Sequence, residues 1–154
     1  MMDHLMATHA TNPVGIIGSG TMGAGIAQAA AAAGWQVHLY DIEETLLEQA
    51  ASNISNRFER LVEKGRISEE QSIEFQNCIM TTSSLDDLSD CDLIIEAIVE
   101  DFDIKSKVLR SALELGEKAV VATNTSSLSV TELAEASGSP NRVVGMHFFN
   151  PAPI

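Results

Sequence analysis

The fold is decided by Val14-Gly15-Ile16-Ile17-Gly18-Ser19-Gly20-Thr21-Met22-Gly23, in which a short apolar run breaks into a glycine-spaced turn. Gly18 permits the tight turn at the end of a strand, and Gly20 leaves no Cβ between the backbone and an approaching phosphate. Gly23 allows the following helix to pack closely on the strand. The free N–H groups at the start of that helix, together with the positive end of its dipole, then face the place where a phosphate would bind. The stretch therefore predicts a cradle for nucleotide phosphates, formed by residues 18–23.

The residues after this turn complete a strand, helix, strand unit. Residues 25–33 are rich in alanine and predict a helix, which Gly34 ends in a left-handed conformation. The segment 35–41 then alternates apolar and polar residues, as a half-buried strand does, and finishes at Asp41. An acidic side chain there accepts both hydroxyls of an adenosine ribose and repels a 2′-phosphate, so the pattern favours NAD over NADP. The alternative is a glycine-rich turn that binds nothing, with Asp41 merely ending the strand.

The composition fits one globular domain. The chain has 154 residues, of which 45% are hydrophobic, enough for a buried core. Its net charge of −13 argues against a nucleic-acid or anionic-membrane surface, and no apolar stretch is long enough to span a bilayer. Cys78 and Cys91 lack the spacing of a metal site or disulfide framework, so we expect no metal, free thiols and a cytoplasmic protein. We expect residues 1–12 to be a disordered leader and residues 13–154 to form the domain.

Strand and helix patterns alternate along the rest of the chain. This alternation predicts an α/β protein of the Rossmann type, with a doubly wound, mostly parallel sheet and helices on both faces. In the helix predicted over residues 103–116, we expect an inward face made of Ile104, Val108, Leu109, Ala112 and Leu115. The other expected elements are helices over residues 43–64, 68–75 and 129–137, and strands over residues 79–83, 92–97, 118–123 and 142–148.

Basic residues are concentrated near the end of the helix predicted over residues 43–64. Spacings of three and four place Arg57, Arg60 and Lys64 on one side of that helix. One interpretation is a solvated face, with Glu59 and Glu63 as intrahelical partners and cations placed favourably at a helix C-terminus. The other is a docking patch for a phosphorylated substrate.

Polar residues follow three of the predicted strands, in the segments 96–100, 124–127 and 147–150. In an open α/β sheet, ligands bind outside the carboxyl ends of the strands, so these segments are the candidate site. Ser126 and Ser127 supply hydroxyls that can hold a substrate oxygen, and a histidine such as His147 titrates in the range that suits proton transfer with an alcohol. A lone histidine at a strand end is also often structural, but beside an NAD pattern it is the candidate base.

Four motifs together resemble the N-terminal domain of L-3-hydroxyacyl-CoA dehydrogenases, a family that includes the bacterial 3-hydroxybutyryl-CoA enzymes. The resemblance extends from Pro13 to the end of the chain. It implies oxidation of the 3-hydroxyl of an acyl-CoA to a ketone, with hydride passing to NAD. The motifs are Gly18-Ser19-Gly20-Thr21-Met22-Gly23, Glu96-Ala97-Ile98-Val99-Glu100, Asn124-Thr125-Ser126-Ser127-Leu128 and His147-Phe148-Phe149-Asn150-Pro151.

The same resemblance implies roles for individual residues. His147 would take the hydroxyl proton, Ser126 would hydrogen-bond the same oxygen, and Asn150 would lie beside them at the nicotinamide and substrate. Glu100 and Lys105 would join the glycine turn and Asp41 on the cofactor side.

The resemblance also bears on the basic residues of the helix. Lys64 matches a position that meets the CoA phosphates, which favours a docking patch for acyl-CoA formed by Arg57, Arg60 and Lys64.

The family pattern has later parts that the sequence lacks: a glutamate that orients the histidine, a second asparagine, and a helical domain that forms the dimer. We therefore expect the chain to bind NAD but to turn over hydroxyacyl-CoA very poorly, and the full-length form to be a homodimer. Two alternatives remain open. One is a dehydrogenase of a free hydroxy acid, as in the L-gulonate dehydrogenase and lambda-crystallin branch; the other is a non-catalytic NAD-binding module.

Overall fold

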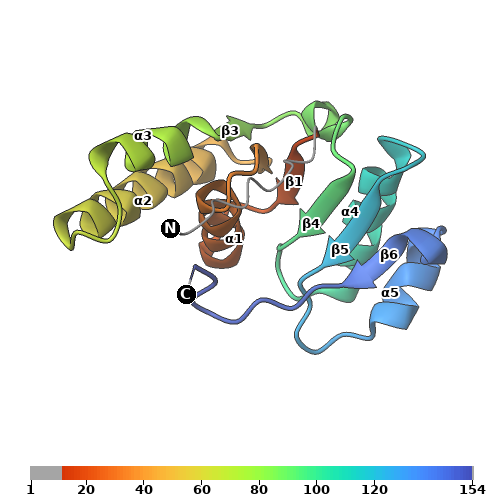
Figure 1. The fold of residues 1–154 in the computed structure, drawn as a ribbon. Helices are drawn as coiled ribbons and strands as arrows, with labels where there is room; N and C mark the ends of the chain where they lie inside the picture. Colours follow the sequence, from red (N-terminus) through yellow and green to blue (C-terminus); the bar gives the residue numbers. More distant parts are fainter. Residues whose placement is uncertain (1–11, 154) are drawn as a thin grey trace, which may run out of the picture.

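The computed structural model describes residues 12–153, which form a parallel sheet with helices on both faces (Figure 1). The strand order is β3-β2-β1-β4-β5-β6, and every neighbouring pair is parallel. The chain thus starts near the middle of the sheet and winds outward in both directions, which confirms the predicted doubly wound fold. The predicted leader lies, except for Asn12, outside the described residues. The strands are β1 (Val14–Ile17), β2 (Val37–Tyr40), β3 (Ile79–Thr82), β4 (Leu93–Glu96), β5 (Val120–Thr123) and β6 (Val143–Gly145).

Two apolar cores hold the helices against the sheet. The first contains Ile26 of α1 and Phe58 of α2, and the second contains Leu109 of α4. Because side chains alternate across a strand, Ile95 belongs to the first core and its neighbour Ile94 to the second. The helices are α1 (Thr21–Ala32), α2 (Glu44–Glu63), α3 (Glu69–Asn77), α4 (Phe102–Glu114) and α5 (Val130–Ser137), with short 3-10 helices η1 (Leu85–Leu88) and η2 (Pro140–Arg142).

The turn between β1 and α1 depends on two glycines. Gly18 has a φ of 102°, in the left-handed region that favours glycine. A Cβ on Gly23 would lie only 1.7 Å from the carbonyl oxygen of Gly18, so no larger residue fits while the turn keeps this shape. The predicted roles of these two glycines are thereby explained in atomic detail.

The helices α2 and α3 form a hairpin that extends away from the sheet (Figure 1). Ser68 begins α3 with a capping box, in which its hydroxyl accepts from the N–H of Gln71 and the Gln71 side chain accepts from the N–H of Ser68. None of the helices within residues 12–153 is long and apolar enough to cross a membrane.

The predicted inward face of α4 is wrong at one residue, Ile104, which is 45% exposed. Its other four residues are confirmed: Leu109 and Ala112 are buried, and Val108 and Leu115 pack against the second core. Asp101 caps α4 through the N–H of Ile104, and the helix then turns Lys105, Leu109 and Ala112 toward the sheet. Apolar spacing alone could not predict this rotation, because the buried residue of the first turn is a lysine whose charge is paired inside the protein.

The last strand is also shorter than predicted. β6 ends at Gly145 rather than at residue 148, although the N–H of Met146 still donates to the carbonyl of Thr123. The N–H of Phe148 then donates to the side-chain oxygen of Asn124 at 2.7 Å. Because a side chain replaces the strand partner there, the chain leaves the sheet before His147.

We predict that Gly23→Ala lowers the free energy of unfolding by about 3 kcal/mol or more, because the new methyl group overlaps the Gly18 carbonyl. Urea unfolding followed by circular dichroism measures this loss. Gly116→Ala is the matched control, since a Cβ there meets its nearest atom at an ordinary 3.7 Å. Equal stability of the two variants would contradict the proposed packing of α1 on the turn.

Candidate functional site

The N-terminus of α1 is open at the glycine turn. Gly20 is the N-cap of the helix, no side chain caps it, and its first turn contains no acidic residue. The first-turn N–H groups therefore have no acceptor from the helix itself. A Cβ on Gly20 would meet nothing within 4 Å, so open space lies in front of these donors. This arrangement fits the phosphates of a dinucleotide, as the sequence predicts.

A cleft with a volume of about 540 Å³ runs past this helix end. It contains the predicted residues Gly18, Gly20 and Asp41. Its walls also carry the exposed apolar side chains of Ile42, which the sequence analysis does not predict, and of Val99, which it places in the segment 96–100 without a role. Apolar residues that protrude beside a phosphate-binding turn suit the faces of an adenine ring. Their exposure is what identifies these side chains, and only the folded structure shows it.

Asp41 is held in place by the turn that it faces. Its Oδ2 accepts hydrogen bonds from the N–H and the hydroxyl of Ser19, both at 2.8 Å, and its Oδ1 accepts from the N–H of Glu43 at 3.1 Å. Ser19, which the sequence places in the phosphate cradle, is buried and points to this carboxylate. The two predicted cofactor residues are therefore coupled, and Ser19 orients the group expected to meet the ribose.

A second cleft, of about 310 Å³, brings together residues that are far apart in the sequence. It is lined by five predicted site residues: Met22, Glu100, Ser126, His147 and Asn150. It also includes Asn124, which belongs to the predicted segment 124–127 but has no individual role assigned from the sequence; its side-chain oxygen accepts from the N–H of Phe148. Because the cleft joins the ends of three strands, it matches the predicted position of the site.

His147 is exposed in this cleft. Its ring lies against that of Phe149, with the ring centroids 4.8 Å apart and the planes inclined by 39°. Within residues 12–153, no hydrogen bond to its ring nitrogens is found. The imidazole is accordingly accessible for proton transfer, while its orientation depends on the contact with Phe149.

Glu100 connects the loop of residues 124–127, here called the serine loop, to the start of α4. Its Oε1 accepts from the N–H groups of Ser126 and Ser127, at 2.9 and 3.0 Å, and from the hydroxyls of Thr125 and Ser127. Burial raises the pKa of Glu100, but the hydrogen bonds from Thr125, Ser127 and Ser126, together with Lys105, lower it to about 2. Glu100 is therefore charged at neutral pH, and its carboxylate fixes the loop that carries Ser126.

Lys105 lies beneath this cleft. Its side chain is 1% exposed, and its Nζ lies 2.6 Å from Oε1 of Glu96 and 3.4 Å from Oε2 of Glu100. The structure thus places the ammonium inside the protein, in contact with carboxylates of the same motif. A cofactor role for Lys105 stays a prediction, and the contact to Glu100 is the route by which it could act.

The basic residues of α2 lie elsewhere. Neither cleft is lined by Arg57, Arg60 or Lys64, and the end of α2 belongs to the hairpin that extends from the sheet (Figure 1). Arg57 turns back to donate to the side chain of Gln28 at 3.5 Å. Within residues 12–153, no carboxylate lies within 4.0 Å of these three cations, so the intrahelical ion pairs considered from the sequence are not formed.

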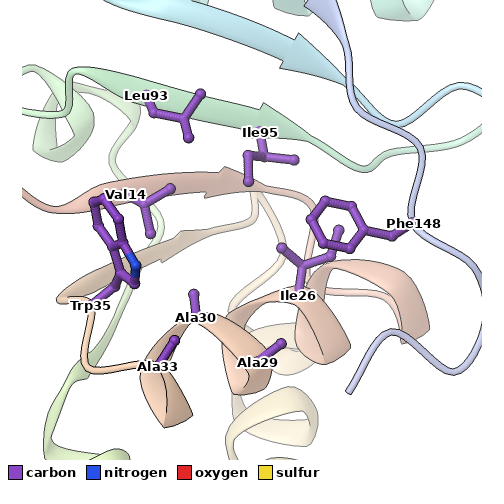
Figure 2. Close-up of a pocket in the computed structure, with 9 residues that line it drawn as sticks. All are labelled: Val14, Ile26, Ala29, Ala30, Ala33, Trp35, Leu93, Ile95 and Phe148. Atoms are coloured by element: carbon purple, nitrogen blue, oxygen red, sulfur yellow. The ribbon is translucent and has the colours of Figure 1, made fainter. Parts of the chain in front are cut away.

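A separate apolar cavity of about 320 Å³ lies between α1 and the sheet (Figure 2). None of the predicted site residues lines it, and it offers almost no polar group to orient a ligand. Phe148 lines both this cavity and the cleft of His147. The cavity is lined by Val14, Ile26, Ala29, Ala30, Ala33, Trp35, Leu93, Ile95 and Phe148.

One group of side chains has metal-ligand composition. The ligand atoms of His38, Asp90 and Cys91 lie within 4.8 Å of one another. Burial, followed by the charges of Asp90 and Asp92, raises the pKa of the Cys91 thiol to about 12, and His38 Nδ1 lies 2.7 Å from the carbonyl of Asp87. These contacts account for the group without an ion, and the expected lack of a metal stays a prediction.

A sheet that winds outward from β1, an open helix N-terminus and an acidic residue after β2 define a Rossmann-type dinucleotide-binding domain. Comparison with known families is more specific. The sequence profile described as "3-hydroxyacyl-CoA dehydrogenase, NAD binding domain" matches residues 13–154, so the chain belongs to this family.

The names of individual proteins that are similar to this chain agree with this family. The chain is 42% identical over 142 residues to the 3-hydroxybutyryl-CoA dehydrogenase of Bradyrhizobium diazoefficiens, covering 92% of this chain and 48% of that protein. It resembles the crystal structure of 3-hydroxybutyryl-CoA dehydrogenase from Escherichia coli with a TM-score of 0.90 at 39% identity, covering 93% of this chain and 30% of that one. The corresponding enzyme from Ralstonia eutropha gives a TM-score of 0.90 at 38% identity, covering 94% and 52%. The chain spans about half the length of the curated relatives it matches.

The low pKa of Glu100 predicts a pH-dependent contribution to stability. Its folded pKa of about 2 lies below the ordinary value of 4.5, so the charge stabilises the fold above pH 4.5. That contribution is lost as the pH falls toward 2. We expect Glu100→Gln to be less stable than the wild type at neutral pH, with a difference that shrinks between about pH 5 and pH 2. Urea unfolding of both proteins across this range measures it, and a difference independent of pH would contradict it.

Proposed function

We propose that the chain supplies the NAD site and the catalytic base of an enzyme that oxidises the 3-hydroxyl of an L-3-hydroxyacyl-CoA to a ketone. The observation that carries this proposal is the adjoining position of the two clefts, which share Ala97 and Ile98 in their walls. One cleft contains the glycine turn and Asp41, and the other contains Ser126 and His147. A dinucleotide laid along both has room for its adenosine at Asp41 and its nicotinamide at His147.

The residues of the second cleft have distinct tasks in this reaction. His147 accepts the proton of the substrate hydroxyl through an exposed ring nitrogen. The hydroxyl of Ser126 hydrogen-bonds the same oxygen, on a loop that Glu100 holds by backbone N–H groups. Asn150 lines the cleft beside them and offers an amide to cofactor and substrate. When bound, NAD supplies the acceptor for the hydride from the carbon that bears the hydroxyl.

Acyl-CoA recognition is assigned to Arg60 and Lys64, with Arg57 as a weaker contributor. Arg60 and Lys64 are exposed at the end of α2 and have no carboxylate within 4.0 Å among the described residues, so both charges are available to phosphates. Arg57 is partly engaged by Gln28. The relatives named 3-hydroxybutyryl-CoA dehydrogenase support an acyl-CoA as the substrate class.

The whole enzyme requires more than these residues. We assign residues 13–154 to the NAD-binding domain and the remaining parts to a region like the second half of the relatives, with a homodimer as the complete form. The free thiols of Cys78 and Cys91 suit a reducing compartment such as the cytoplasm.

Cofactor choice gives a direct prediction. The chain is expected to bind NADH at least about tenfold more tightly than NADPH, because the Asp41 carboxylate repels a 2′-phosphate. Asp41→Ala should narrow this ratio, and Gly20→Ala should weaken both ligands by placing a methyl group before the open N–H groups. Isothermal titration calorimetry measures these affinities, with urea unfolding to verify that each variant is folded. Equal affinity of the wild type for the two cofactors would refute the role of Asp41.

Catalysis and CoA recognition are separable in a fusion of this chain to the second half of the Bradyrhizobium diazoefficiens relative. In that enzyme, His147→Ala should lower kcat by about a thousandfold, because the base is lost. Arg60→Glu with Lys64→Glu should raise KM for 3-hydroxybutyryl-CoA several-fold and leave kcat nearly unchanged. Steady-state kinetics with varied acyl-CoA measure both, and the chain without the fusion should show little turnover.

The same assay decides between the alternatives. If the fused enzyme oxidised a free hydroxy acid, and the charge reversal at Arg60 and Lys64 left that activity unchanged, the result would favour a dehydrogenase of free hydroxy acids, which acts without CoA. An unchanged rate in His147→Ala would show that this histidine is not the base. Glu59→Lys with Glu63→Lys is the control on the same helix, and these changes should not raise KM for the acyl-CoA.

A further inference from the structure

Glu96 is a buried carboxylate at the end of β4. Its side chain is 0% exposed. Oε1 accepts from Lys105 Nζ at 2.6 Å and from the N–H of Ile98 at 2.8 Å, and Oε2 accepts from the Thr123 hydroxyl at 2.7 Å. These donors come from α4, from the turn after β4 and from β5. One carboxylate therefore joins three elements at the carboxyl edge of the sheet.

Stability alone is a weak reason for such a group. Removing two charges from water is costly, and a buried ion pair replaced by neutral side chains of similar size often leaves a protein equally stable. Glu96 and Lys105 nevertheless lie in a strand and a helix whose other buried residues are uncharged and mostly apolar, such as Ile95 and Leu109. The role of these two buried charges therefore lies in the segments that they hold in place.

The contacts lead to the serine loop by two routes. On one side, Thr123 is the last residue of β5, directly before the loop, and its hydroxyl is bound to Glu96. On the other side, Lys105 Nζ reaches Oε2 of Glu100 at 3.4 Å, while Oε1 of Glu100 accepts the N–H groups of Ser126 and Ser127. The loop is thus fixed at its start and at its middle by partners of the same buried carboxylate.

We propose that Glu96 is a positioning residue of the active site: it fixes Thr123 and the Lys105–Glu100 pair, and through them the loop that presents Ser126 to the cleft of His147. Lys105 then acts through Glu100 and has no need to touch the cofactor. The catalytic meaning of this placement rests on the proposed function, whereas the placement itself does not.

The double variant Glu96→Gln with Lys105→Met tests the proposal in the chain itself. It removes both buried charges and keeps side chains of similar size, so the sheet is expected to remain folded. Amide hydrogen exchange, measured by NMR on 15N-labelled protein, should accelerate at Ser126 and Ser127 by about tenfold, roughly the net worth of one hydrogen bond. Amides of the β5 ladder should keep their rates within about a factor of two. Exchange that rises equally in the loop and the ladder, or in neither, would overturn the proposal.

Two further variants sharpen this test. Lys107→Met is the matched control, since Lys107 is exposed on the same helix, and its loop exchange should equal that of the wild type. Thr123→Val keeps the buried shape and removes only the hydroxyl that Glu96 accepts. It should accelerate exchange at Ser126 and Ser127 several-fold, and it keeps the proposal testable if the double variant does not fold. Unchanged loop exchange in Thr123→Val would remove the first of the two routes and with it the proposal as stated.

A catalytic readout separates positioning from mere support of the fold. In the fused enzyme, Thr123→Val should lower kcat by about tenfold while KM for NAD stays within about twofold, because the loop is displaced and the cofactor turn is intact. An unchanged kcat despite faster loop exchange would also overturn the positioning role. If the unmodified fusion were inactive, the proposed function would fail, and the exchange rates would still decide whether Glu96 holds the loop.

Discussion

The close contact between Gly23 and the carbonyl of Gly18 is the constraint on which the rest of the site depends. A helix can begin this near the end of β1 only because no Cβ separates them. Its N-terminus is then left uncapped, with open space before it and Asp41 anchored at its side by Ser19. The features that define a dinucleotide cradle thus follow from one backbone approach.

A second set of constraints brings the chemistry to this cradle. The winding of the sheet places the end of β4 next to β1, with the ends of β5 and β6 following in order along the same edge. Polar contacts, together with the packing of Ile98 and Phe148 on the apolar cores, set the loops there. Glu100 accepts hydrogen bonds from the N–H groups of Ser126 and Ser127 in the serine loop. Asn124 accepts one from the N–H of Phe148, in the chain after β6. The protein is acidic and has few cationic side chains, and one of these, Lys105, is buried.

The sequence predicted the glycine turn and the end of α1 at Gly34 well, because both depend on neighbouring residues, and it predicted the parallel sheet from the alternation of strand and helix patterns. It predicted the α4 face wrongly at Ile104, because the pairing of Lys105 with Glu96 is a contact between a helix and a strand that helix periodicity does not reveal. The end of β6 was misplaced for the same reason, since Asn124 takes the N–H that a continued strand would use. The exposed side chain of Ile42 has no sequence signal, and Val99 has none beyond its place in the segment 96–100; only the folded structure shows both in the wall of a cleft.

Membership of the 3-hydroxyacyl-CoA dehydrogenase family and the open helix end lead to one central claim, that the phosphates of NAD lie at the first turn of α1. The most direct test is an NMR titration of the 15N-labelled chain with NAD. We expect the largest amide shifts at residues 20–23, with further shifts near Asp41 and Val99. Saturating NAD that leaves residues 20–23 unshifted, or shifts confined to another face of the protein, would contradict it.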